Sequence, residues 1–293
     1  MTANQRGSLF MVAAMAGFAV EDMFIKSAAK AMPLGQVLAL MGALGILWFA
    51  LQSRRVGEPA FPTALRSRTM LVRSSFEMVG RLFYSLAIAL TPISVASAIL
   101  QATPLVVVAG AALIFGERVG LWRWALTALG FAGVLVILRP GLEGFDAMAI
   151  LAVIGLLGFA GRDLATRAAP PALSNAQLGV AGFAVLGLSG LIILGVQGGP
   201  VLPDALPLAK ALGAAAFGIL GYSYLTRAMR TGEVSAVTPF RYTRLLFALL
   251  VGVVVFGERP DLATLIGATL IVNSGIYTLI RGNRQGAAPA RLP

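Results

Sequence analysis

The sequence predicts an all-α integral membrane protein with ten transmembrane helices. Of its 293 residues, 58% are hydrophobic and 12% are charged, and the mean hydropathy is +0.87. Soluble proteins carry roughly a quarter charged residues. Long apolar stretches recur along the chain, and about 20 apolar residues per helix suffice to cross a bilayer. Closed β-barrels also span membranes, but the sequence lacks their pattern of about ten alternating residues per strand.

Ten stretches are long and apolar enough to be interpreted as spans, five in each half of the chain. Charged residues are rare within them, so each one that occurs there needs a partner or a polar surrounding. We expect helices at Leu9–Ser27, Leu34–Leu51, Met70–Leu90, Val95–Phe115, Leu121–Leu138, Ala147–Thr166, Gln177–Val196, Leu208–Arg227, Val234–Phe256 and Leu262–Ile280.

The first segment shares features with a cleavable signal peptide, because Arg6 precedes an apolar stretch. However, Glu21 and Asp22 interrupt that stretch, and a similar segment recurs in the middle of the chain. We therefore expect the first segment to remain in the protein and to span the membrane.

Two motifs recur at a single separation of 141 residues. Gly17-Phe-Ala-Val-Glu-Asp22 returns as Gly158-Phe-Ala-Gly-Arg-Asp163, and Phe115-Gly-Glu-Arg118 returns as Phe256-Gly-Glu-Arg259. Two well-separated matches at one offset indicate that the chain consists of two copies of one unit.

The two copies are predicted to span residues 8–140 and 149–281, followed by a cytoplasmic tail, residues 282–293. Because each copy has five spans, the second copy enters the membrane from the opposite face. Inverted repeats of this kind are typical of secondary transporters, whose substrate site lies near the midplane between the repeats.

The distribution of lysine and arginine predicts that both termini face the cytoplasm, as in a bacterial inner membrane protein. With that orientation the basic residues gather in the inner connections, whereas the outer ones hold Lys30, Arg139 and Arg259. The same bias explains the net charge of +11, so no nucleic-acid partner is expected. The predicted inner residues are Arg6, Arg54, Arg55, Arg66, Arg68, Arg118, Arg230, Arg281, Arg284 and Arg291.

The third segment carries a polar stripe. Arg73, Glu77, Arg81 and Tyr84 follow one another at spacings of four, four and three residues, which places them on one face of a helix. That face must turn toward the protein interior. Two interpretations stand: an Arg-Glu-Arg group that holds helices together, or the wall of a cavity in which Arg81 contacts the substrate.

Both copies keep an acidic residue with a cation four positions later. Asp22 is followed by Lys26, and Asp163 is followed by Arg167. An ion pair one helical turn apart is the simplest interpretation. A symmetric pair near each face, with a role in gating or in substrate contact, is the alternative.

The fourth and ninth segments correspond, with Gln101 equivalent to Tyr242. Together with Arg241 and with Tyr222 of the eighth segment, these residues supply hydrogen-bonding groups within the bilayer. Pro104 predicts a kink in the fourth helix. Since tyrosines also anchor helices at membrane interfaces, that role stays open for Tyr222 and Tyr242.

The residues that are missing narrow the chemistry. The chain has no cysteine and no histidine, which removes the usual metal ligands and proton relay. It also lacks a GxxxxGK[ST] phosphate loop. We therefore expect no metal, no cofactor and no ATP-driven pumping by this chain alone. If transport is coupled to protons, the proton carrier is one of Glu21, Asp22, Glu77 and Asp163.

Several motifs together resemble a known family. Ser97-Ala-Ile-Leu-Gln-Ala-Thr-Pro104 is followed by a long apolar run, Phe115-Gly-Glu-Arg118 and Arg139-Pro-Gly141. This pattern resembles the EamA repeat of the drug/metabolite transporter superfamily. The second copy keeps Phe256-Gly-Glu-Arg259 but departs at Thr238-Pro-Phe-Arg-Tyr242, where Pro104 has no counterpart. The resemblance covers nearly the whole chain and implies ten helices in two inverted repeats around a central cavity.

Within the superfamily the chain is most similar to YddG-like exporters of aromatic and other amino acids. That resemblance implies a small-molecule substrate moved by alternating access in the lipid bilayer, and a monomer is compatible with it. Another metabolite or an organic cation is the alternative substrate, and an intramembrane enzyme or a channel is a more distant alternative. The polar residues suit an amino acid, with candidate contacts at Arg81 and Arg241 for a carboxylate, Glu77 and Asp22 for an ammonium, and Phe18, Tyr222 and Tyr242 for a side chain.

Overall fold

The computed structural model describes residues 1–115, 121–139, 146–167, 173–231 and 238–286. Within these residues the chain is helical and contains no strand, so the predicted all-α class is confirmed. The elements are α1 (Ala3–Ala28), α2 (Leu34–Arg55), η1 (Thr63–Arg66), α3 (Arg68–Leu90), α4 (Ile93–Leu100), α5 (Thr103–Phe115), α6 (Leu121–Leu138), α7 (Ala149–Arg167), α8 (Asn175–Val196), α9 (Ala205–Thr231), η2 (Thr238–Tyr242), α11 (Thr243–Phe256) and α12 (Leu262–Gly286).

The fourth predicted span is broken into two helices. α4 ends at Leu100 and α5 begins at Thr103, with a turn at Gln101 and Ala102 between them. Pro104 is the second residue of α5, where a missing N–H is tolerated because the first turn of a helix has no acceptor for it. The expected effect of Pro104 is therefore confirmed, and a continuous helix over Val95–Phe115 is wrong.

The ninth span also begins irregularly. η2 passes directly into α11 at Thr243, and the predicted start at Val234 lies outside the described residues. The Gly116–Arg118 part of the first Phe-Gly-Glu-Arg motif and the end of the predicted tail lie outside them too.

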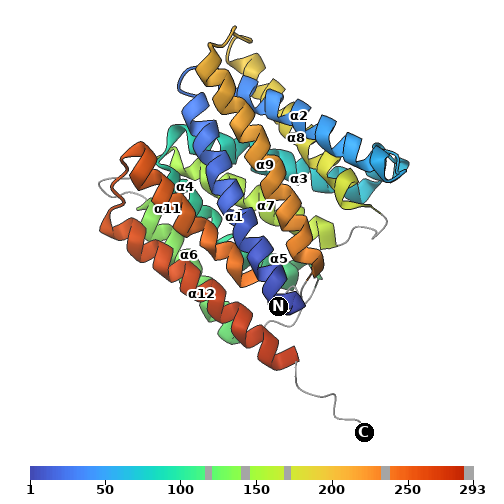
Figure 1. The fold of residues 1–293 in the computed structure, drawn as a ribbon. Helices are drawn as coiled ribbons and strands as arrows, with labels where there is room; N and C mark the ends of the chain where they lie inside the picture. Colours follow the sequence, from blue (N-terminus) through green and yellow to red (C-terminus); the bar gives the residue numbers. More distant parts are fainter. Residues whose placement is uncertain (116–120, 140–145, 168–172, 232–237, 287–293) are drawn as a thin grey trace.

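Helices of one half pack against helices of the other (Figure 1). α1 lies along α9, α3 along α7, α2 along α8 and α6 along α12. If the two halves are exchanged, the α1–α9 pair becomes the α7–α3 pair. The α2–α8 and α6–α12 pairs each remain the same pair. The pairing therefore has the twofold pattern of two related five-helix units.

Glycine contacts repeat this relation in detail. A Cβ added to Gly17 would lie 3.1 Å from Cα of Gly221, where α1 crosses α9, and one added to Gly158 would lie 2.3 Å from N of Gly80, where α7 crosses α3. Gly17 and Gly158 are equivalent in the two copies, and so are Gly80 and Gly221. Small residues allow such close helix crossings in membranes. The same type of crossing therefore occurs twice, between α1 and α9 and between α7 and α3.

The surface is apolar and part of the interior is charged. Leu47, Trp48 and Leu191 are about half exposed, at 57%, 53% and 57%, whereas Arg73 and Glu77 are buried, at 6% and 1%. A soluble protein has the opposite arrangement, and a large exposed apolar surface suits contact with lipid. The helices thus present apolar side chains outward and polar ones inward.

Four helices among the described residues are long and apolar enough to cross a membrane by themselves, and three shorter helices are also apolar. Residue 1 and the end of α12 lie at the same end of the molecule, the lower end in Figure 1. The four long helices are Ala3–Ala28, Leu34–Arg55, Asn175–Val196 and Ala205–Ala228, and the shorter ones are Ile93–Val107, Trp124–Leu138 and Leu262–Ser274.

Candidate functional site

Asp22 connects four helices in the interior. Its Oδ2 accepts a hydrogen bond from Nη2 of Arg244 on α11 at 2.7 Å and one from the hydroxyl of Tyr84 on α3 at 3.3 Å. The Tyr84 hydroxyl also lies 3.4 Å from Oγ of Ser97 on α4. The guanidinium of Arg244 lies over the ring of Phe18, 5.3 Å from its centre. The sequence prediction of an Asp22–Lys26 pair is therefore wrong, because Arg244 from the other half occupies the carboxylate.

Glu77 is enclosed by two arginines. It pairs with Arg73, one helical turn away on α3, at 2.9 Å and with Arg162 of α7 at 3.6 Å. Arg162 also donates to Oδ1 of Asp163 at 2.8 Å. The predicted partner of Asp163, Arg167, has its side chain outside the described residues. Because an isolated buried charge is costly, these mutual pairs allow the charges to lie inside the protein.

We refer to Asp22, Glu77 and Asp163 with Arg73, Arg162 and Arg244 as the interior cluster. Its members come from α1, α3, α7 and α11, so both halves of the chain contribute. The polar stripe on α3 therefore faces inward as predicted.

Arg81, the predicted substrate contact, lies beside the interior cluster. Its guanidinium carbon is 5.9 Å from the centre of the Phe159 ring, which also lies 5.0 Å from that of Arg162. The Nε of Arg81 is buried and has no hydrogen-bond partner among the described residues. Arg81 thus lies next to an aromatic ring and keeps one N–H donor unused among the described residues.

The predicted candidates from the ninth span separate into two groups. The backbone oxygen of Arg241 accepts a hydrogen bond from Nε2 of Gln101 at 3.2 Å, which ties η2 to the break between α4 and α5. The guanidinium of Arg241 interacts electrostatically with Asp163. Tyr242 is buried, and its hydroxyl has no hydrogen-bond partner in the described part of the chain. Gln101 and Arg241 therefore connect the halves, while Tyr242 offers a free polar group.

Tyr222 belongs to an aromatic group. Its ring contacts those of Phe49 and Phe183 edge to face, at 5.4 and 6.2 Å between ring centres. These rings come from α9, α2 and α8, which places Tyr222 in the packing between them. A Cβ added to Gly182 would lie 3.5 Å from Oε1 of Glu77 and 3.9 Å from Cε2 of Tyr222, so Tyr222 borders the interior cluster.

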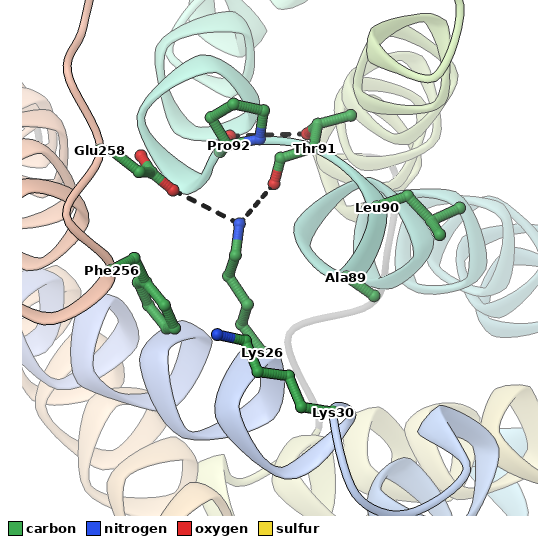
Figure 2. Close-up of a pocket in the computed structure, with 8 residues that line it drawn as sticks. All are labelled: Lys26, Lys30, Ala89, Leu90, Thr91, Pro92, Phe256 and Glu258. Carbon is green, nitrogen blue, oxygen red and sulfur yellow. Dashed lines mark hydrogen bonds and ion pairs between the residues drawn. The ribbon is translucent and has the colours of Figure 1, made fainter.

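A second polar group, which we call the end cluster, lies where α1 ends and consists of Lys26, Thr91, Ser94 and Glu258. Figure 2 shows Lys26, Thr91 and Glu258 of this group. Nζ of Lys26 donates to the backbone oxygen of Thr91 at 2.5 Å and to Oε1 of Glu258 at 3.3 Å. Glu258 also accepts from the backbone N–H groups of Ile93 and Ser94 at 2.7 and 3.1 Å. A carboxylate at the start of a helix is favourable because the free N–H groups there carry partial positive charge.

The end cluster explains the Phe256-Gly-Glu-Arg259 motif. Gly257 has φ +65°, a left-handed conformation that suits glycine and ends α11. This turn brings Glu258 to the start of α4, while the ring of Phe256 lies 5.2 Å from Nζ of Lys26. Together with Lys30 and residues 89–92, these side chains line a pocket of about 300 Å³ (Figure 2).

Next to this motif, Asp261 lies directly before the first residue of α12. Its Oδ1 accepts from the backbone N–H of Thr264 at 2.8 Å, and its other oxygen pairs with Arg139 from the end of α6. The backbone hydrogen bond from Thr264, followed in effect by the bond from Arg139, holds the pKa of Asp261 below its usual range. Asp261 thus stays charged at neutral pH and joins the paired helices α6 and α12.

Sequence reasoning missed the role of Arg162 and the partners of Lys26. Arg162 stands where the first copy has Glu21, and this change of charge between otherwise similar copies was the available signal. Glu258 was visible only as part of a repeated motif. The contacts of both residues join segments more than 80 positions apart, which no local pattern reveals.

A helical bundle of two related halves with a charged interior is the architecture of a membrane transporter, and comparison with known proteins agrees. The EamA-like transporter family matches the chain twice, at residues 5–139 and 145–280. The chain belongs to the EamA-like transporter family.

Curated relatives are also transporters. The chain is 28% identical to a riboflavin transporter of Rhizobium johnstonii, with 81% of this chain and 78% of the relative covered. It is 27% identical to the pseudopaline exporter CntI of Pseudomonas aeruginosa, covering 91% and 93%. It is 21% identical to an S-adenosylmethionine uptake transporter of Rickettsia prowazekii, covering 76% and 75%.

One crystal structure of a protein superposes with a TM-score of 0.56 at 22% sequence identity, covering 94% of this chain and 99% of the other. This likeness concerns the fold. The substrates in the names of the relatives differ from one another, and those names include both uptake and export.

Proposed function

We propose that this transporter exports amino acids, including aromatic ones, from the cytoplasm by alternating access. The observation that carries the proposal is the excess of arginine over acidic side chains in the interior of the protein. Five arginines, Arg73, Arg81, Arg162, Arg241 and Arg244, interact with four carboxylates, Glu21, Asp22, Glu77 and Asp163. A surplus of positive charge in a membrane interior favours a substrate with a carboxylate.

Arg81 is the proposed carboxylate contact. Its Nε has no hydrogen-bond partner in the described residues, whereas Arg244 and Arg162 are bound to acidic side chains. The rings of Phe159 and Phe18 flank the arginines. An apolar or aromatic substrate side chain would pack against such rings.

Asp22 and Glu77 are less suited to the substrate's ammonium than the sequence suggested. Each is already neutralised by arginine, Asp22 at 2.7 Å and Glu77 at 2.9 Å. An ammonium would have to displace a guanidinium from either one. Tyr242, with its free hydroxyl, remains a proposed polar contact, and Gln101 and Asp163 are proposed to border the site.

The two halves, residues 8–140 and 149–281, are proposed to rock against each other around this site in the cytoplasmic membrane, with both termini inside. The end cluster lies at the end of α1 opposite residue 1, and with the proposed cytoplasmic N-terminus this end faces the outside. Its contacts among α1, α4 and the α11–α12 connection would hold that end closed.

A larger metabolite is the second candidate substrate. It is favoured by the relatives named for riboflavin, S-adenosylmethionine and pseudopaline. S-adenosylmethionine carries the amino and carboxyl groups of an amino acid, so the same arginine would suit it.

Counterflow of labelled substrate in proteoliposomes tests the proposal. We expect saturable exchange with phenylalanine, methionine or lysine, and none in empty liposomes. Arg81→Ala should weaken the apparent affinity roughly 10- to 100-fold, since a hydrogen bond to a charged group contributes about 1.5–3 kcal/mol. The exposed Arg54→Ala is the matched control. Exchange of riboflavin or S-adenosylmethionine, but of no amino acid, would contradict it.

A further inference from the structure

Glu21 stands where the two copies of the chain differ in charge. The first copy reads Gly17-Phe-Ala-Val-Glu-Asp22, and the second reads Gly158-Phe-Ala-Gly-Arg-Asp163. In the second copy Arg162 neutralises its neighbour Asp163 and reaches Glu77. The first copy has an acid at that position, so two carboxylates adjoin on α1.

Glu21 is a buried residue that lacks the close arginine partner of the other interior carboxylates in the described part of the chain. Glu21 is 3% exposed, and the described part of the structure provides it with no hydrogen bond or ion pair. Its Oε1 packs against Gly218 of α9, where an added Cβ would lie 2.8 Å away. The charged groups that act on it are Arg81 from α3, Arg244 from α11 and Asp22 on its own helix.

The other interior carboxylates differ from Glu21 in this respect. Asp22 is bound to Arg244 at 2.7 Å, Glu77 to Arg73 at 2.9 Å and Asp163 to Arg162 at 2.8 Å. A proton on any of these three carboxylates would break an ion pair, either between two helices or within a single helix. A proton on Glu21 breaks none, and it removes from a membrane interior a charge that has no direct ion-pair partner among the described residues.

We propose that Glu21 binds the coupling proton of transport and, when deprotonated, the ammonium group of the substrate. The two ligands exclude each other, so substrate leaves in exchange for a proton. The exchange forms no covalent bond: Glu21 releases its proton to water, the carboxylate accepts the ammonium, and a proton from the opposite side later displaces the substrate.

The surroundings of Glu21 fit this exchange. Arg81, the proposed carboxylate contact, acts electrostatically on Glu21. The amino and carboxyl groups of one amino acid would therefore meet opposite charges on neighbouring helices, α1 and α3. Gly218 has no side chain, and this allows the carboxylate of Glu21 to lie directly against α9.

This inference rests on the proposed function, and its test separates the two. Purified protein in weakly buffered detergent receives phenylalanine, while a pH-indicator dye records proton release and calorimetry records binding. Wild-type protein should release up to one proton per bound substrate. From about pH 9 to pH 5 its apparent affinity should fall by up to tenfold for each pH unit on the acidic limb, because the proton competes.

Glu21→Gln should release no proton, and its weakened affinity should not vary with pH. Glu21→Asp keeps the carboxylate and should retain proton release, which guards against a folding defect in the glutamine variant. Asp204→Asn, at an exposed position, is the matched control and should behave like the wild type.

Three results are decisive. Binding without proton release and with an affinity independent of pH would overturn the role of Glu21 but leave amino-acid transport standing. Proton release that persists in Glu21→Gln would assign the proton to another group and equally overturn it. Absence of both binding and counterflow for every amino acid would instead refute the proposed function.

Discussion

Glu77 shows how single side chains carry charge in this interior. It is 1% exposed and lies between Arg73 of its own helix and Arg162 of α7. Removing one member of a buried ion pair costs more than the pair contributes, because the remaining charge stays buried and unpaired. Without Glu77, Arg73 would lose its 2.9 Å ion pair, whereas Arg162 would keep its pair with Asp163.

We therefore expect Glu77→Gln to lower the free energy of unfolding by about 3–5 kcal/mol. Thermal unfolding in detergent, followed by tryptophan fluorescence, measures the change. Asp204→Asn, at an exposed position, serves as the control. A melting temperature for Glu77→Gln equal to that of the control would show that the pair does not hold α3 and α7 together.

At the scale of helices, the crossings of α1 with α9 and of α7 with α3 depend on glycine. The Cβ of an alanine at Gly158 would lie 2.3 Å from the backbone nitrogen of Gly80, so one backbone has to move. Gly158→Ala should destabilise the protein by about 1–3 kcal/mol, as overpacking does. The matched control is Gly195→Ala on α8, where an added Cβ meets nothing within 4 Å. Equal melting temperatures for the two variants would contradict the close crossing.

The end cluster joins the ends of several helices through Glu258. Glu258→Gln removes the charge that Lys26 binds and weakens the cap of α4. We expect this end of the molecule to open more often. Because the chain has no cysteine, Ala89→Cys at the pocket should react with a maleimide several-fold faster in the Glu258→Gln background.

Leu202→Cys, at a fully exposed position, provides the control for that experiment. Its labelling rate should be the same in the wild-type background and in the Glu258→Gln background. Equal rates at Ala89→Cys in both backgrounds would mean that the end cluster does not restrict access.

The sequence predicted helices well where apolar length and composition decide them. Leu34, Leu121 and Leu262 start helices as predicted, and Leu90 and Val196 end them as predicted. From Pro104 the sequence predicted a kink in the fourth span but not the full break after Leu100, because proline disrupts a helix without specifying the turn that follows. Lys26 was assigned to Asp22 because local spacing favoured it, yet Glu258, 232 residues away, binds it.

At the scale of the whole molecule, duplication explains both the fold and the asymmetry of the site. Equivalent glycines build equivalent crossings, whereas Glu21 and Arg162 occupy equivalent places with opposite charge. The scaffold therefore keeps the twofold relation that alternating access exploits. The charged interior departs from it, as a site for one unsymmetrical substrate requires.

The central claim is that the interior binds the carboxylate of an amino acid through arginine. Competition in the counterflow assay tests it most directly, with phenylalanine and its amide, which lacks the carboxylate, as competitors. Phenylalanine should compete and the amide should compete roughly 10- to 100-fold less well in the wild type, with most of that difference lost in Arg81→Ala. Equal competition by the two compounds in the wild type would contradict the account.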